Sequence, residues 1–419
     1  MPTEHHPKRQ TAPAAPPGVR WGPRPLPAHL AAAATLFATS NAVLGSLKSG
    51  SPLWNPLTQP TGDLKPAADA LAKAFAGADP DAFAAAAARE STSRMDAFLT
   101  GVERYRTASY SRNVPDPPPV WSEGSTRLLD YGADTGNRPV LLIPSLINRG
   151  YILDLSQACS FARWLAAQGM RPLLVDWGAP GPAEQNFGLD QYIARLERGL
   201  DIAAKAGPVP VLGYCMGGLL AMALAVRRQV DIDRLALLAT PWDFHAPNPA
   251  TALRLSQFAA ACEPLLALQG VLPVDVIQML FFSLDPFLGV RKFTAFGAAA
   301  PDSARAEAFV ALEDWLNDGA PLPATVAREC LRGWYGDNTP ARGEWRIGGS
   351  VVSPALFAKP AYVAAPANDR IVPPESALAI ASDLPDVTVV RPNLGHIGMM
   401  VGAAAKETVW DPLSAWLQS

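Results

Sequence analysis

The chain has 419 residues, of which 49% are hydrophobic and 17% are charged, so it can bury one large core and carry a smaller appended region. Its formal net charge of −3 provides no general basic field, which argues against a nucleic acid as a partner. The four cysteines are widely spaced, without the pairing of a metal site or a disulfide framework, and this pattern fits a reducing cytoplasm: Cys159, Cys215, Cys262 and Cys330.

The N-terminal part is predicted to contain a leader followed by helices. Residues 1–26 are polar and rich in proline, without the apolar core of a signal peptide, and we expect them to be disordered. Residues 27–119 form a predicted helical region, with helical spacing over 66–76 and 82–105. The uncharged run 30–47 is shorter than the roughly 20 residues that a membrane span needs, so we expect no transmembrane segment.

A proline cluster at 115–119 marks the boundary to a predicted catalytic domain over residues 120–419. Short apolar runs alternate there with helical segments, which predicts an α/β fold with a mostly parallel sheet flanked by helices. The predicted strands lie at 127–131, 140–143, 172–175, 209–212 and 235–238, with two more at 361–364 and 387–390. The insertion at about 245–352 is rich in Leu, Phe and Trp without obvious strands, and is predicted to be a helical cap over the site.

The segment Gly213-Tyr214-Cys215-Met216-Gly217-Gly218 follows one of these strands and precedes a helical run. Strand, tight turn and helix are the context of a nucleophile elbow, here with cysteine where α/β-hydrolases usually carry serine. The glycines keep bulk away from a residue with strained backbone geometry, and the start of the helix offers N–H donors to a thiolate or an oxyanion. The alternative interpretation is a buried, inert cysteine between glycines that serve only packing.

The partners of such a nucleophile follow it in the order acid, then histidine. Only His245 and His396 lie downstream of Cys215, and His396 directly follows the last predicted strand. Asp369 lies in the loop after the preceding strand, where the orienting carboxylate is usually found. The alternatives are a surface aspartate in a turn and a histidine whose hydrogen bonds are satisfied within the protein.

These residues are part of a wider resemblance to the polyhydroxyalkanoate synthase family, bacterial polyester polymerases with an α/β-hydrolase core, and most of all to its shorter, class III type. The resemblance covers about residues 120–419, in family order. It is carried by Pro144-Ser145-Leu146-Ile147-Asn148-Arg149, Tyr151-Ile152-Leu153-Asp154-Leu155-Ser156, Val175-Asp176-Trp177-Gly178, Thr240-Pro241-Trp242-Asp243-Phe244, Ser283-Leu284-Asp285-Pro286-Phe287, Asp369-Arg370-Ile371-Val372-Pro373-Pro374 and Gly395-His396-Ile397-Gly398.

The resemblance implies an acyltransferase that polymerises 3-hydroxyacyl-coenzyme A thioesters through Cys215 as nucleophile, Asp369 as acid and His396 as base. Backbone N–H groups of Met216 and near Leu146 are expected to hold the oxyanion. The substrate carries the coenzyme A, and we expect no other cofactor and no metal. The growing polyester is the second partner, a homodimer or a second synthase subunit stays open, and polyester granules are a further location within the cytoplasm. Four cap aromatics are expected to close an apolar channel or to form cap core: Phe281, Phe282, Phe287 and Trp315.

Two other functions stay open at this stage. A dienelactone hydrolase or another ester or thioester hydrolase would use the same three residues, although dienelactone hydrolases are compact and lack so long an insertion. A granule-associated paralogue without catalytic activity is the alternative from a different class.

Overall fold

An eight-stranded sheet forms the centre of the computed structural model, which describes residues 19–48, 65, 66, 70, 73, 74, 79–132, 137–246, 248–300 and 303–419. The strands follow the order β1-β2-β4-β3-β5-β6-β11-β12 across the sheet. The six strands from β4 to β12 run parallel to one another, whereas β2 is antiparallel to both β1 and β4. Their bounds are β1 Pro119–Glu123, β2 Thr126–Asp130, β3 Arg138–Ile143, β4 Met170–Asp176, β5 Val209–Tyr214, β6 Ile232–Leu238, β11 Ala361–Ala364 and β12 Val387–Val390.

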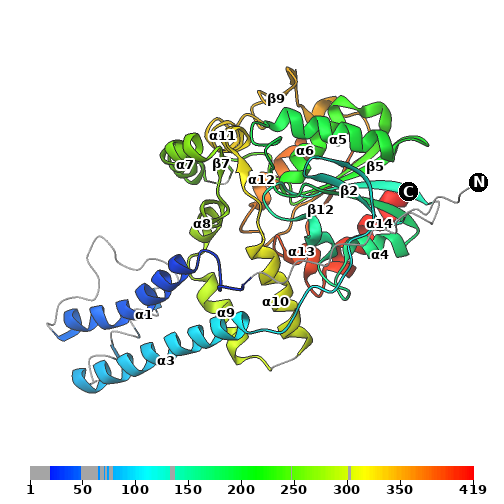
Figure 1. The fold of residues 1–419 in the computed structure, drawn as a ribbon. Helices are drawn as coiled ribbons and strands as arrows, with labels where there is room; N and C mark the ends of the chain where they lie inside the picture. Colours follow the sequence, from blue (N-terminus) through cyan, green and yellow to red (C-terminus); the bar gives the residue numbers. More distant parts are fainter. Residues whose placement is uncertain are drawn as a thin grey trace, which may run out of the picture.

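Helices cover both faces of this sheet (Figure 1). One core cluster joins the sheet to α5 (Leu189–Ala203) and α6 (Met216–Arg227). A second cluster on the opposite face joins it to α4 (Phe161–Ala167) and α14 (Asp411–Gln418). This three-layer arrangement, with crossover connections between parallel strands, is the α/β-hydrolase fold and confirms the predicted fold class.

Strand β1 was not predicted, because it starts at the end of the proline cluster that was interpreted as a boundary. Pro119 is tolerated as the first residue of this strand, since β1 lies at the edge of the sheet and pairs only with β2. The first strand of the sheet therefore begins one residue before the predicted start of the catalytic domain.

The segment between β6 and β11 forms the cap over the sheet. Its helices are α7 (Pro249–Gln269), α8 (Val274–Leu284), α9 (Leu288–Ala298), α10 (Ala304–Asn317), α11 (Ala324–Arg328) and a π-helical turn at Glu329–Gly336. The expectation that this insertion contains no strands is wrong in detail. Two short antiparallel pairs occur, β7 (Val271–Leu272) with β8 (Leu322–Pro323) and β9 (Arg346–Ile347) with β10 (Ser350–Val351), and two-residue strands leave no periodic pattern in the sequence.

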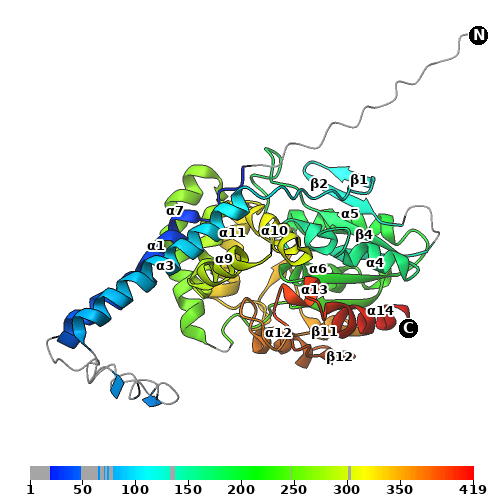
Figure 2. The ribbon, with the colours of Figure 1, turned by 90° about the horizontal axis from the view of Figure 1, so that it is seen from below.

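Two long helices, α1 (Leu26–Lys48) and α3 (Pro80–Arg106), lie side by side and extend away from the domain (Figures 1 and 2). Helix α3 crosses α9 at a point of very close approach. A Cβ atom on Gly101 would lie 1.9 Å from the Phe293 carbonyl oxygen, so only glycine fits this crossing.

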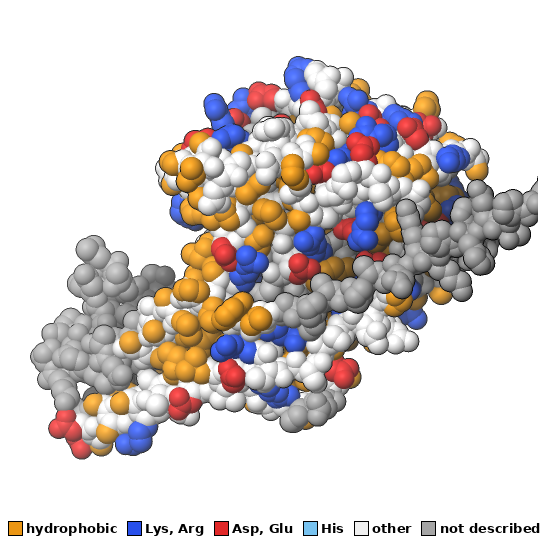
Figure 3. Space-filling model, in the orientation of Figure 1, with side chains coloured by type: hydrophobic (Ala, Val, Ile, Leu, Met, Phe, Trp, Pro, Cys, Tyr) orange, Lys and Arg blue, Asp and Glu red, His pale blue; other side chains and the backbone are white. Residues whose placement is uncertain are grey.

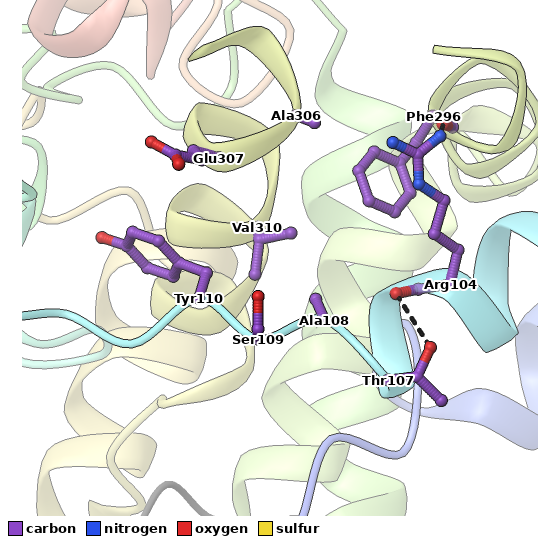
Figure 4. A pocket seen from close by; sticks show the side chains of 9 residues that line it. All are labelled: Arg104, Thr107, Ala108, Ser109, Tyr110, Phe296, Ala306, Glu307 and Val310. Atoms are coloured by element: carbon purple, nitrogen blue, oxygen red, sulfur yellow. Dashed lines mark hydrogen bonds between the residues drawn. The ribbon is translucent and has the colours of Figure 1, made fainter. Parts of the chain in front are cut away.

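Figure 4 shows the end of α3 at this junction, beside a hollow of about 240 Å³. The Arg104 guanidinium lies over the Phe296 ring at 4.7 Å and donates to the Phe296 carbonyl at 2.9 Å and to the Ala299 carbonyl at 2.5 Å. A cation at the carbonyl end of α9 satisfies groups that the helix itself leaves unpaired. The junction thus fixes the extended helix pair to the cap.

The prediction that residues 1–26 are disordered is wrong for the last residues of this segment. Residues 1–18 lie outside the described part, but Arg20 forms an ion pair with Asp314 of α10 at 2.6 Å and donates to the Ala108 carbonyl, and helix α1 already begins at Leu26. These contacts are distant in sequence, so composition alone did not indicate them. Most of the predicted helix at 66–76 lies outside the described residues.

Among the residues that the structure describes, none of the helices has the length and hydrophobicity needed to cross a membrane. Within the same residues, no group of three or more His, Cys, Asp or Glu side chains is arranged to hold a metal ion.

Candidate active site

Cys215 stands at the tight turn between β5 and α6, at the carboxyl end of the parallel strands. Its backbone has φ 56° and ψ −129°, a region that costs an L-residue about 1–3 kcal/mol. The turn is held by hydrogen bonds from Cys215 N to the Leu238 carbonyl and from Gly218 N to the Cys215 carbonyl, both 2.9 Å long. This strained strand-to-helix turn has the backbone geometry that a nucleophile elbow requires.

The glycines after Cys215 are required by close packing. A Cβ atom on Gly217 would lie 2.1 Å from the Ile143 carbonyl oxygen, and one on Gly218 would lie 1.8 Å from Thr240 Oγ1. Because Gly217 has no side chain, the start of α6 contacts the end of β3 directly, and Gly218 in the same way permits contact with Thr240 after β6. The loop that begins at Pro144 is therefore held beside Cys215.

His396 lies in the loop between β12 and the short helix α13 (Gly398–Val401), and Asp369 lies in the loop after β11. Asp369 Oδ2 is 2.7 Å from His396 Nδ1, and its other oxygen accepts hydrogen bonds from the Ile371 and Val372 N–H groups, each at 2.8 Å. The Asp369 side chain is fully buried. A carboxylate satisfied in this way fixes the orientation and the tautomer of the imidazole.

The charge state of His396 depends on both neighbours. Burial alone would lower the pKa of His396. The charge of Cys215 and the hydrogen bonds of His396 with Asp369 and Cys215 have the opposite and larger effect, and they raise this pKa to about 10. The raised pKa favours a protonated imidazole next to Cys215, and an imidazolium in this position would stabilise a thiolate.

Cys215 and His396 line the same cavity, which has a volume of about 350 Å³. Its wall is mostly apolar. It is formed by Pro144, Ser145, Ile147, Asn148, Arg149, Ile152, Tyr214, Cys215, Gln278, Phe281, Leu284, Asp285, Leu288, Trp315, Leu316, Arg370, Ile371, His396 and Ile397. Of the four cap aromatics singled out in the sequence, Phe281 and Trp315 line this cavity, and Phe282 and Phe287 are not part of its wall.

The two predicted oxyanion donors come from different segments, the start of α6 and the loop after β3. Met216 is the first residue of α6, where backbone N–H groups have no partner within the helix. Leu146 lies in the loop after β3, which is anchored by a 3.0 Å hydrogen bond from Trp177 Nε1 to the Pro144 carbonyl. Their role as oxyanion donors stays a prediction.

His245, the other downstream histidine, lies in a different setting. Its Nε2 is 3.0 Å from the Tyr335 carbonyl and 3.2 Å from the Gly336 carbonyl, at the end of the π-helical turn. It is not part of the cavity wall. These contacts give His245 a structural role in the cap.

Sequence reasoning did not identify Tyr214 as part of this arrangement. Its hydroxyl donates a 3.1 Å hydrogen bond to the His396 carbonyl, and its ring lies 5.3 Å from the imidazole. Burial raises the pKa of Tyr214 well above its usual value, so the hydroxyl remains a donor. The only sequence signal was its position directly before Cys215 in the elbow.

In the acyl transfer that the sequence predicts, Asp369→Asn should slow acylation by about 10²–10⁴-fold without loss of the fold. The asparagine oxygen can keep the two N–H bonds, but its NH₂ group then faces His396 Nδ1 and forces the ring proton onto the nitrogen needed by Cys215. Single-turnover thiol release measures the effect, with circular dichroism as the check on folding. A rate close to that of the unmodified protein would remove Asp369 from the mechanism.

Comparison with known proteins finds several relatives that carry the same name. The chain is 27% identical over 316 residues to the poly(3-hydroxyalkanoate) polymerase subunit PhaC of Haloarcula marismortui, a match that covers 71% of this chain and 66% of that protein. It is 28% identical over 291 residues to the subunit of the same name from Synechocystis (67% and 77% covered), and 27% identical over 312 residues to that of Allochromatium vinosum (71% and 87%). The chain thus spans slightly less than two thirds of the length of the haloarchaeal relative. No protein-family profile matches the chain.

Solved structures with a related arrangement are distant in sequence. A thermophilic esterase from Thermogutta terrifontis is 19% identical, with a TM-score of 0.42 and coverage of 73% of this chain and 97% of that one. The thioesterase domain from the curacin biosynthetic pathway is 14% identical, with a TM-score of 0.42 and coverage of 73% and 100%.

Proposed function

We propose that this protein is a polyester synthase, an acyltransferase that polymerises 3-hydroxyacyl-coenzyme A thioesters and releases coenzyme A. The observation that carries the proposal is the buried Asp369–His396 pair beside Cys215 in a largely apolar cavity. Similarity to proteins named poly(3-hydroxyalkanoate) polymerase supports the choice of substrate.

In the first half-reaction, the Cys215 thiolate attacks the thioester carbonyl of the substrate. The N–H groups of Met216 and Leu146 stabilise the oxyanion, an effect commonly worth about 3 kcal/mol per donor. The bond between the carbonyl carbon and the coenzyme A sulfur breaks, and the departing thiolate takes the proton of His396. The acyl group is now a thioester of Cys215.

In the second half-reaction, the 3-hydroxyl of another coenzyme A thioester attacks this carbonyl. Its proton passes to His396, the bond to Cys215 sulfur breaks, and the thiolate forms again. The product is a coenzyme A thioester that is one unit longer and can acylate Cys215 in turn. A cysteine suits this reaction because its thioester stays activated toward a hydroxyl, whereas a serine ester would not.

Water competes with the 3-hydroxyl as a nucleophile, and the cap would limit the access of water to the thioester. Phe281 of α8 and Trp315 of α10 line the cavity, and Trp315 Nε1 donates to the Arg149 carbonyl at 2.8 Å, which fixes the indole. Apolar walls of this kind disfavour the entry of water next to a reactive thioester.

The test is product identity during many turnovers of 3-hydroxybutyryl-coenzyme A. Thiol release is followed together with mass spectrometry of the products. We expect polymer or enzyme-bound oligomer with little free 3-hydroxybutyrate. Steady release of the free acid without oligomer would show a hydrolase, and no thiol release under any condition would favour the non-catalytic alternative.

A further inference from the structure

The cavity opens at the connection between α8 and α9. Leu284 and Leu288 line the cavity wall and are also 41% and 50% exposed to solvent, so they stand where it reaches the surface. We call these two side chains the apolar lip. Phe281, one turn before Leu284 on α8, continues the apolar surface inward toward Cys215.

Charged side chains also stand at this opening, next to the two leucines. Arg370, whose side chain is 82% exposed, lies 3.3 Å from Asp285, and Arg149 lies 3.5 Å from Asp318. Both arginines line the cavity. Guanidinium groups suit the phosphates of coenzyme A, whereas leucine side chains do not. The opening thus combines ion-paired arginines, which suit the phosphates of coenzyme A, with leucines, which suit an apolar chain.

Apolar surface continues beyond the lip. Phe282 packs edge-on against the ring of His29 on α1, with centroids 4.9 Å apart, and a Cβ atom on Gly289 would lie 2.2 Å from His29 Nδ1. Helix α1 is therefore in direct contact with the segment that carries the lip. Figure 3 shows hydrophobic side chains gathered where α1 lies beside α9 and below α8.

We propose that the apolar lip, Leu284 and Leu288, holds the growing polyester chain where it leaves the cavity. This inference rests on the proposed synthase activity. The polyester backbone carries no charge and only ester oxygens, so contact with the two leucines removes apolar surface of both partners from water. The chain grows from Cys215 in a cavity of about 350 Å³, so a polymer of more than a few units extends through the opening. The arginines beside the lip would contact the phosphates of coenzyme A.

The double variant Leu284→Glu/Leu288→Glu tests this inference. Weaker retention of the chain should shorten the polymer made from 3-hydroxybutyryl-coenzyme A, by roughly tenfold if the two leucine contacts together contribute about 1.4 kcal/mol. The matched control is Leu253→Glu/Leu268→Glu on α7, where the two leucines are 59% and 83% exposed and do not line the cavity. The molar mass of the extracted polymer and the first-turnover burst of coenzyme A are measured for each protein.

Shorter polymer from the lip variant alone supports the inference. Unchanged polymer length in the lip variant, or equal shortening in the α7 control, would overturn the inference. A raised KM for the thioester at unchanged polymer length would also overturn it, because the lip would then bind coenzyme A. If the glutamates abolish the burst, Leu284→Ser/Leu288→Ser is read by the same criteria. An absence of polymer from the unmodified protein would instead refute the synthase activity.

Discussion

Cys215→Ala should abolish coenzyme A release, by at least about 10⁴-fold, while the protein remains folded. The reason is chemical: alanine has no atom that can attack the thioester carbonyl. The strained backbone does not forbid the change, because alanine and cysteine carry the same Cβ atom at φ 56°. Thiol release from 3-hydroxybutyryl-coenzyme A measures the loss, and thermal unfolding checks the fold.

A serine and a second cysteine provide the controls for this experiment. Cys215→Ser should leave only weak activity, since a hydroxyl is much harder to deprotonate than a thiol. Cys159→Ala should leave the rate nearly unchanged, because Cys159 lies outside the cavity wall, where its Sγ is 4.0 Å from the Val401 carbonyl oxygen. Near-normal turnover of Cys215→Ala would mean that another group attacks the substrate.

His396→Ala should lower the rate of thiol release by about 10²–10⁴-fold, the usual contribution of a positioned acid or base. The protein loses both the proton donor for the leaving thiolate and the cation beside Cys215. His245→Gln is the matched control and should have a far smaller effect, because an amide can still donate to the carbonyls at the end of the π-helical turn. Equal losses in the two variants would contradict the assignment of His396.

The pH dependence of this pair provides a second readout. A raised pKa of about 10 means that the protonated imidazole is present below this pH and is lost as the pH rises through it. Alkylation of Cys215 by iodoacetamide at pH 7 should therefore be roughly tenfold slower or more in His396→Ala. The difference should shrink as the pH approaches 10. A pH-independent ratio would show that His396 does not stabilise the thiolate through its charge.

The central part of the fold could be predicted from sequence because its signals are local. The buried run before Cys215, the glycines after it and the apolar strands before Asp369 and His396 are each contiguous in the chain. Parallel strands place their carboxyl ends at one edge of the sheet, so the loops that follow them meet there.

Features that depend on contacts distant in sequence could not be predicted in this way. Nothing near Arg20 indicates its ion pair with Asp314, almost three hundred residues away, and nothing near Gly101 indicates its contact with Phe293. Strand β1 could not be predicted for a different reason. It begins in a proline-rich segment, and edge strands tolerate prolines that a central strand would exclude. The opening of the cavity likewise combines residues of α8 and α9 with two separate loops of the sheet.

The covalent intermediate offers the most direct test of the account. Butyryl-coenzyme A lacks the 3-hydroxyl, so it should acylate the enzyme once and then stall for want of a second nucleophile. Intact-protein mass spectrometry with peptide mapping should find one butyryl group per chain, on Cys215, together with one equivalent of coenzyme A released. A butyryl group on another residue, or steady release of butyrate with no lasting adduct, would contradict a synthase that works through Cys215.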